Sequence, residues 1–228
     1  MAARTKGFWM LVVVAMAMAV GIAVYYFNSQ EQTASPEAGA TNAVQYEFVW
    51  RDGDVRGVDL PSKVRVPTTG KVVPIHLVQD MVSQNGEGKI EFLQRVRQVM
   101  VSYSEKHSHE ACGEICSDGA TNSIRITTNA AVTRCAVAPI CMSGQETTLE
   151  SIHSHCPSSG HLKATLADEY LSEGVIRKGM RPARCDTERF SSMDLDGRRP
   201  GWLAGRGALL QHDGPARITR HQLFPAGE

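Results

Sequence analysis

The chain has 228 residues, of which 24 are basic, 24 are acidic and 42% are hydrophobic. This length is sufficient for one domain of ordinary size with a buried core. The charges balance, and no basic stripe interleaved with aromatic residues is present, so we do not expect a nucleic-acid partner.

The first predicted element is an unbroken apolar run over residues 7–27, preceded by Arg4 and Lys6. As a helix it would be about 31 Å long, enough to cross a bilayer core. The positive-inside rule places residues 1–6 in the cytoplasm and the rest of the chain outside. We predict a single-pass anchor in the inner (cytoplasmic) membrane with the folded part in the periplasm. A cleaved signal peptide is the alternative, and it also exports the chain.

Three segments follow the apolar run. Residues 28–43 are rich in small and polar residues and predict a flexible linker. Short β-prone stretches, separated by Pro67 and Gly70, predict an N-terminal β extension over residues 44–87. From Ile90 to Tyr103, apolar residues recur at three- and four-residue steps, which predicts an amphipathic helix packed on the core.

The remaining chain, residues 88–228, has the mixed order of elements typical of an α/β (α+β) domain. Its other predicted elements are strands at 123–128, 136–140 and 147–152, a helix over 164–176 and a hairpin around 205–207.

Six cysteines in an exported chain indicate disulfides, although sequence alone does not choose among the pairings. A zinc ribbon is weakly supported, because no Cys-x-x-Cys pair is present. The cysteines stand at positions 112, 116, 135, 141, 156 and 185.

Three short motifs contain residue types suited to metal-assisted hydrolysis. The first contains Glu110, the second is His153-x-His155 at the end of a predicted strand, and the third is Ser191-x-x-Asp194. Alternate strand residues share a face, so both imidazoles would point the same way. With Asp194 they supply two nitrogens and a carboxylate oxygen for zinc, which leaves one position for water. Glu110 suits a general acid and base, and Ser191 suits an oxyanion donor, a helix N-cap or both.

This set of motifs resembles the JAMM metallopeptidases, also called the JAB or MPN-plus superfamily. The resemblance covers about residues 88–214 and includes Glu-Ala-Cys-Gly after a helix and Gly201-Trp202-Leu203 after Ser191-x-x-Asp194. It implies a curved mixed β-sheet flanked by helices, one zinc ion and hydrolysis of amide or isopeptide bonds. It assigns Glu110 as acid and base, Ser191 as oxyanion donor, and the two histidines and Asp194 as ligands.

The chain departs from the family pattern after the second histidine. Cys156 precedes Pro157, and an insert over residues 156–190 separates the histidines from Ser191. We predict a Cys156–Cys185 disulfide that closes the base of this insert, a contribution of about 3 to 4 kcal/mol in the chain-entropy model. The insert is either a lid that selects substrates or a plain surface loop.

The leading functional prediction is a membrane-anchored, extracytoplasmic zinc metallopeptidase that acts on peptide or protein substrates in the cell envelope. The alternative is a catalytically inactive JAB-like binding or assembly module of a bacterial envelope or secretion apparatus, because the insert could displace Asp194. A cysteine hydrolase that uses Cys156 beside His155 is disfavoured, because a nucleophile and its base rarely adjoin in sequence and an exported cysteine is readily oxidised.

Four further residues offer alternative metal ligands. His161 and Asp196 are substitutes within the main site, although Asp196 does not fit the spacing from the serine. His107 and His109 form either a second metal site or, as we prefer, two exposed loop residues.

Overall fold

The computed structural model describes residues 46–157, 161–181, 189–191, 194, 200–213 and 217–222. All of them belong to the compact unit Val44–Glu228. Within these ranges no helix has both the length and the apolar character that a membrane span requires. The predicted cytoplasmic segment 1–6, anchor 7–27 and linker 28–43 lie outside the described residues.

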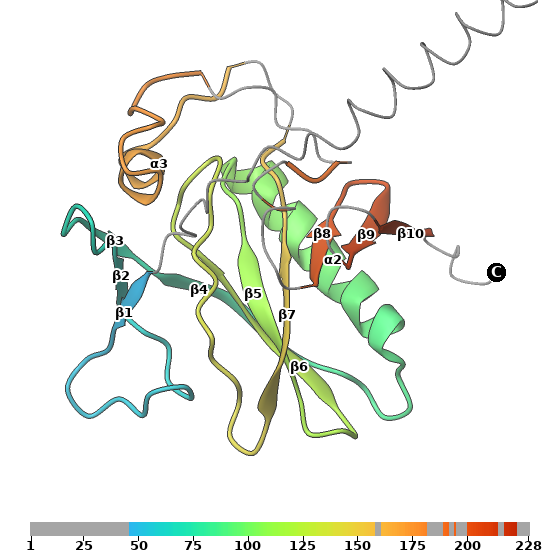
Figure 1. Ribbon diagram of the computed structural model, residues 1–228. Helices are drawn as coiled ribbons and strands as arrows, with labels where there is room; N and C mark the ends of the chain where they lie inside the picture. The colour runs from blue at the N-terminus through green and yellow to red at the C-terminus, as the bar shows by residue number, and fades with distance from the viewer. Residues whose placement is uncertain are drawn as a thin grey trace, which may run out of the picture. The chain divides into compact units, whose positions relative to one another are not determined.

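A seven-stranded mixed sheet forms the centre of the fold, in the order β10-β9-β8-β7-β5-β6-β4 (Figure 1). β7 and β8 are parallel, and the other neighbouring pairs are antiparallel. The predicted α+β class with a mixed sheet is therefore confirmed, as are the strand at 123–128 and the 205–207 hairpin between β8 and β9. The strands are β4 (His76–Val82), β5 (Cys112–Ser117), β6 (Asn122–Thr128), β7 (Glu146–His153), β8 (Gly201–Ala204), β9 (Ala208–His212) and β10 (Ile218–Gln222).

Helix α2 (Lys89–His107) packs on one face of this sheet, and it confirms the predicted amphipathic helix with a few more residues at its ends (Figure 1). Its C-terminus is set by Ser108, which adopts a left-handed conformation with φ of 60°. Burial of each large aliphatic side chain stabilises the fold by roughly 1.5 to 3 kcal/mol. The core beneath the helix includes Phe92, Leu93, Val96, Met100, Ile115, Ile124, Ile126 and Ile152.

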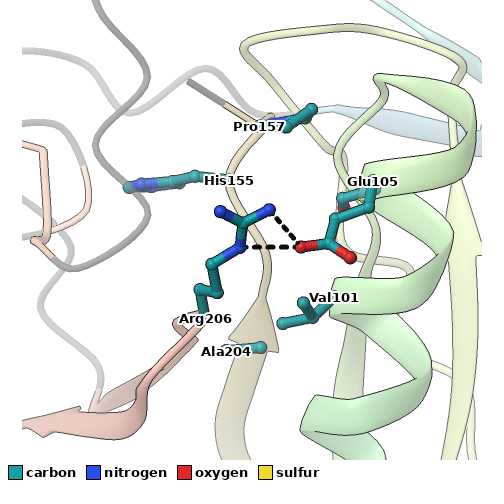
Figure 2. Close-up of a pocket in the computed structure, with 7 residues that line it drawn as sticks. Val101, Glu105, His155, Pro157, Ala204 and Arg206 are labelled. Carbon is teal, nitrogen blue, oxygen red and sulfur yellow. Dashed lines mark hydrogen bonds and ion pairs between the residues drawn. The ribbon is translucent and has the colours of Figure 1, made fainter. Parts of the chain in front are cut away.

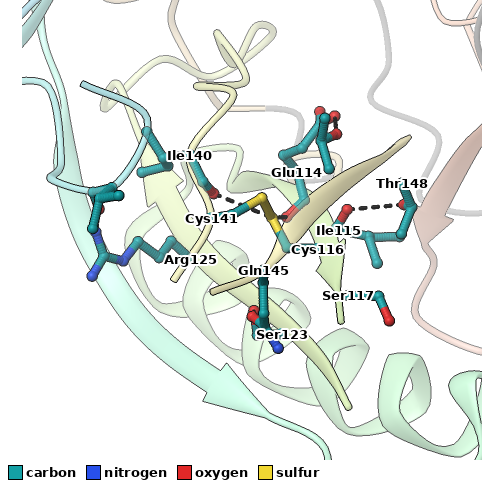
Figure 3. The surroundings of a disulfide bond; sticks show 12 residues. Glu114, Ile115, Cys116, Ser117, Ser123, Arg125, Ile140, Cys141, Gln145 and Thr148 are labelled. Atoms are coloured by element: carbon teal, nitrogen blue, oxygen red, sulfur yellow. Dashed lines mark hydrogen bonds between the residues drawn. A yellow bond between two sulfur atoms is a disulfide. The ribbon is translucent and has the colours of Figure 1, made fainter. Parts of the chain in front are cut away.

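The opposite face of β5 carries two disulfides. Because side chains alternate along a strand, Cys112 and Cys116 lie on the same face, away from Ile115 and helix α2. Cys112 is bonded to Cys135, and Cys116 to Cys141 (Figure 3). These bonds indicate that the domain folds in an extracytoplasmic compartment.

The strand predicted over residues 136–140 is wrong, because this segment has no regular secondary structure. The disulfides of Cys135 and Cys141 fix both of its ends to β5, and Pro139 has no N–H for a strand ladder. The segment instead buries Ala136 and Ile140 as a cross-linked loop.

The N-terminal β extension forms a sheet of its own from β1 (Glu47–Val49), β2 (Lys63–Arg65) and β3 (Val72–Pro74), in that order. The extension predicted over residues 44–87 is only partly separate, because β4 leaves it and pairs with β6 as an edge of the main sheet. The small sheet and the turn beside it bury Val64, Val66, Val73 and Ile75.

Helix α3 (Leu166–Leu171) belongs to the insert and packs against the core of the small sheet through Leu171. This helix is shorter than the one predicted over residues 164–176. Thr165 caps its N-terminus, and the chain turns after Ser172, where Glu173 and Gly174 have φ of 55° and 85°.

Candidate metal centre

The two histidines lie at the C-terminal end of β7, as predicted: His153 is its last residue and His155 follows two positions later. Buried Ser154 holds the segment between them. Its Oγ lies 2.7 Å from Oγ of Ser104 on α2, and it accepts a hydrogen bond of 3.0 Å from the backbone N–H of Ala111. The N–H of Ser154 donates to the carbonyl of Ala111 at 2.9 Å. These bonds fix the backbone that carries both imidazoles.

Phe190 returns the chain to the histidines after the insert. Its ring packs on a small cluster of Leu203, Ala208 and Leu210 from the β8–β9 hairpin. It also lies between two histidine rings, with centroids 4.6 Å from His212 and 6.3 Å from His153. The aromatic contact therefore places the residues after Phe190 beside the end of β7.

Ser191 and Asp194 bond each other reciprocally. The N–H of Ser191 donates to Oδ2 of Asp194 at 2.6 Å, and Oγ of Ser191 accepts from the N–H of Asp194 at 3.3 Å. This pattern is typical of a helix N-cap with an acidic third residue, which agrees with the predicted capping role of Ser191. The geometry leaves its predicted oxyanion role as a proposal.

The Asp194 carboxylate faces both imidazoles. Burial by itself would raise the pKa of Asp194, but the charge of His153 and hydrogen bonds to both histidines outweigh burial. The net effect holds the pKa of Asp194 well below its ordinary range. The carboxylate is therefore ionised at neutral pH and available as a ligand.

The three predicted ligands converge on one point. Nε2 of His153 lies 3.2 Å from Nε2 of His155 and 3.2 Å from Oδ1 of Asp194, and Nε2 of His155 lies 3.2 Å from Oδ2 of Asp194. Ligands placed tetrahedrally at about 2.0 to 2.1 Å from a zinc ion are separated from one another by about 3.3 to 3.4 Å. The two contacts to Asp194 use different oxygens of its carboxylate, so the three residues form a group that could hold one metal ion without identifying that metal.

Glu110 lies on the same side of the sheet as His153. Because Cys112 pairs with His153 across β5 and β7, and Glu110 precedes Cys112 by two residues, the three side chains share a face. The backbone of Glu110 is held by a bond from its N–H to the carbonyl of Ala131 at 2.8 Å. Thr128 also donates from Oγ1 to the carbonyl of Glu110 at 2.7 Å.

Burial raises the pKa of Glu110 to about 8, and the nearby charge of His155 only partly opposes this effect. The charges of Asp194 and Asp168 raise the pKa further. No hydrogen-bond donor to the carboxylate is found among the described residues. A divalent cation held by the triad would relieve the repulsion and lower this pKa, so the surroundings of Glu110 also fit a bound metal.

The described part of the insert is anchored firmly. The carboxylate of Asp168, which is fully buried, accepts hydrogen bonds of 2.7 to 3.0 Å from the N–H groups of Val132 and Thr133 and from the Thr133 hydroxyl. It also accepts bonds from the N–H and hydroxyl of Thr165 at 2.7 and 2.8 Å. These contacts join α3 to the loop whose Ala131 carbonyl holds Glu110.

Of the predicted Cys156–Cys185 disulfide, the structure describes only Cys156. Cys156 is buried and takes part in a disulfide. Cys185 lies outside the described residues, so the pairing stays a prediction.

The alternative ligands that the structure describes, His161, His107 and His109, are not part of the metal-ligating group. His161 is exposed, and Asp196 lies outside the described residues. His107 stacks on Tyr103 with centroids 4.6 Å apart, and burial lowers the pKa of His109. Within the described ranges, the triad of His153, His155 and Asp194 is the only metal-ligating group of its kind.

Sequence reasoning missed His212, which is buried on β9 against Phe190. Opposite it, Gly201 must lack a side chain, since a Cβ there would lie 2.5 Å from Nε2 of His212. Neither residue belongs to a recognisable motif, so the sequence offered no signal for this contact.

A pocket opens beside His155, between α2 and the β8–β9 turn (Figure 2). Its empty volume, including the open mouth, is about 310 Å³. Val101, Pro157 and Ala204 give it apolar walls, and an ion pair between Arg206 and Glu105 lies at 2.7 Å across it.

Comparisons with models of protein families, with curated proteins and with solved structures found no match. A functional assignment therefore depends on the residues of the site.

Proposed function

We propose that this chain is a membrane-anchored, extracytoplasmic zinc metallopeptidase of the JAMM type that hydrolyses peptide or isopeptide bonds. The observation that carries the proposal is the convergence of His153, His155 and Asp194, whose side chains approach one another in pairs at 3.2 Å, beside the buried carboxyl group of Glu110. Two imidazoles and one carboxylate are a donor set typical of hydrolytic zinc sites.

The proposed roles follow from the chemistry of each group. Zinc bound to the triad would supply Lewis acidity that lowers the pKa of a water molecule toward 7. Glu110 takes the proton of the attacking water on its carboxylate and passes it to the leaving amine nitrogen. The hydroxyl of Ser191 donates a hydrogen bond to the carbonyl oxygen as negative charge develops there.

Glu110 favours an enzyme over a binding module. Burial disfavours the charged form of the Glu110 carboxyl group, and a passive scaffold gains nothing from burying it. A perturbed carboxyl group next to three metal ligands is instead typical of a general acid and base. The two disulfides and the apolar run at residues 7–27 support a location outside the cytoplasm, where substrates are peptides or proteins of the cell envelope.

The test is zinc-dependent cleavage of a synthetic peptide library, read as new termini by mass spectrometry. We expect the zinc-loaded chain to cleave a subset of the peptides and Glu110→Gln to retain zinc while losing roughly a hundredfold or more of the rate. Glu146→Gln, at the exposed start of β7 and at the opposite end of this strand from His153, is the matched control and should keep activity. A zinc-loaded parent that cleaves no peptide would contradict the proposal and favour the binding module.

A further inference from the structure

Residues 161–181 of the insert form a compact unit with an inner and an outer side. The two ends of this unit are joined through the backbone of Ala164. Its N–H donates to the carbonyl of Met180 at 2.8 Å, and its carbonyl accepts from the N–H of Gly179 at 2.8 Å. Ala164, Asp168 and Leu171 are buried against the rest of the fold. Ala167 and Tyr170 pack against the same core, whereas several other side chains of this unit are exposed.

The outer side combines apolar and basic residues, and we call it the insert face. Val175 is 77% exposed, Met180 48% and Leu166 44%, which is unusual for apolar side chains so close together in one short segment. The basic members are exposed as well: Lys163, Arg177, Lys178, Arg181 and Lys71, which lies over the ring of Tyr170.

The insert face carries excess positive charge. Among the described residues of this segment, its exposed or half-buried acidic neighbours are Glu169, which accepts a bond from the N–H of Lys178 at 2.8 Å, and Glu173, which is bonded to the hydroxyl of Thr68. Five basic side chains therefore face two carboxylates that already hold other groups. This combination of exposed apolar residues and basic residues is typical of surfaces that bind anionic membranes.

The start of the fold lies next to this face. Tyr46, the first described residue, donates from its hydroxyl to the carbonyl of Leu171 at 3.1 Å. The predicted linker, residues 28–43, connects this point to the apolar run at 7–27. A chain of this length cannot reach farther than about 55 Å even when fully extended, so the fold would stay tethered to the bilayer.

We propose that the insert face docks on the surface of an anionic phospholipid bilayer. Val175, Met180 and Leu166 enter the interface, and the basic side chains bind lipid phosphates. The active surface at the end of β7 is then held at a fixed distance from the membrane. The proposal rests on the predicted membrane segment and is independent of hydrolytic activity.

The test uses the full chain in nanodiscs, either of phosphatidylcholine alone or with about a third phosphatidylglycerol, at low salt. Limited trypsin digestion is followed at Arg177 and Lys178, with cleavage after Arg51 as the internal reference. Arg51 lies in the exposed loop that also carries Val55, which is 59% exposed. We expect the phosphatidylglycerol discs to slow cleavage of the insert at least fivefold relative to the reference, and high salt to remove this protection.

Two substitutions make the test specific. Val175→Asp keeps both trypsin sites and should abolish the protection, because it places a charge in the bilayer interface. Val55→Asp, an equally exposed apolar position outside the insert face, should leave it intact. Equal cleavage ratios in the two lipids would overturn the proposal, as would protection in phosphatidylcholine alone, which would indicate a protein contact in place of anionic lipid.

Discussion

The substitution Glu110→Gln should change how the stability of the metal-free protein depends on pH. In the folded state the pKa of Glu110 rises from an ordinary value of 4.5 to about 8, chiefly because the side chain is buried. Between these values the folded state binds a proton that the unfolded state has released, so stability falls as pH rises from about 4.5 to 8. At ~1.36 kcal/mol for each pH unit, the full effect is roughly 3 to 5 kcal/mol.

Urea unfolding of the oxidised, metal-free protein at several pH values between 5 and 8.5 measures this effect. The parent should lose stability over this range, and Glu110→Gln, which cannot ionise, should lose roughly 3 to 5 kcal/mol less. Groups that do not interact with Glu110 contribute equally in both proteins, so their contribution cancels in the difference. Parallel pH profiles for the two proteins would refute the assignment of Glu110 as a buried, protonated carboxyl group.

Three further substitutions test how the site is held. Asp168→Asn should lower the free energy of unfolding by roughly 3 kcal/mol, because an asparagine amide cannot accept all the hydrogen bonds that the carboxylate accepts. The melting temperature should therefore fall by roughly 6 to 12 °C. An unchanged melting temperature would contradict the anchoring role of Asp168. Ser154→Ala should weaken zinc affinity by about tenfold or more in a competition titration, whereas Ser102→Ala, exposed on helix α2, should not. Phe190→Ala should weaken zinc affinity to a similar degree, because the segment that carries Asp194 loses the contact that holds it. Phe48→Ala, in the small sheet, is the control. Equal zinc affinities of these two variants would argue against a role of Phe190 in positioning Asp194.

The elements with local periodicity were predictable from the sequence. Helix α2 has apolar residues at three- and four-residue steps, and the strand that ends in the two histidines and the β8–β9 hairpin also carry their own short-range patterns. The two histidines face one side because successive side chains of a strand point to opposite faces of the sheet, and this rule needs no knowledge of the rest of the fold.

The sequence analysis missed strand β5 because both faces of this strand are buried, so polar and apolar residues do not alternate between an exposed and a buried face. Cys112, Glu114 and Cys116 are buried under the cross-linked loop, so a face rich in polar atoms is part of the interior. Gly113 fits a close approach to β6, where a Cβ would lie 2.7 Å from the carbonyl oxygen of Arg125. Such contacts depend on the disulfide pairing, which the sequence leaves open.

The position of Asp194 was predictable only through family resemblance. A 35-residue insert separates His155 from Ser191, which precedes Asp194 by three positions, and no local pattern in the sequence indicates that the chain returns to the histidines. The return depends on Phe190 packing beside the β8–β9 hairpin and on the histidine rings. These are long-range packing contacts, which periodicity and spacing do not encode.

Zinc content is the most direct test of the central claim that His153, His155 and Asp194 hold one metal ion. Elemental analysis would compare the purified, oxidised full chain with Asp194→Ala and with Asp52→Ala, which removes an exposed carboxylate far along the chain from the site. We predict about one zinc per chain in the parent and in Asp52→Ala, and less than about a tenth of that in Asp194→Ala. A folded parent that binds no zinc, or an Asp194→Ala variant that binds as much as the parent, would contradict the account.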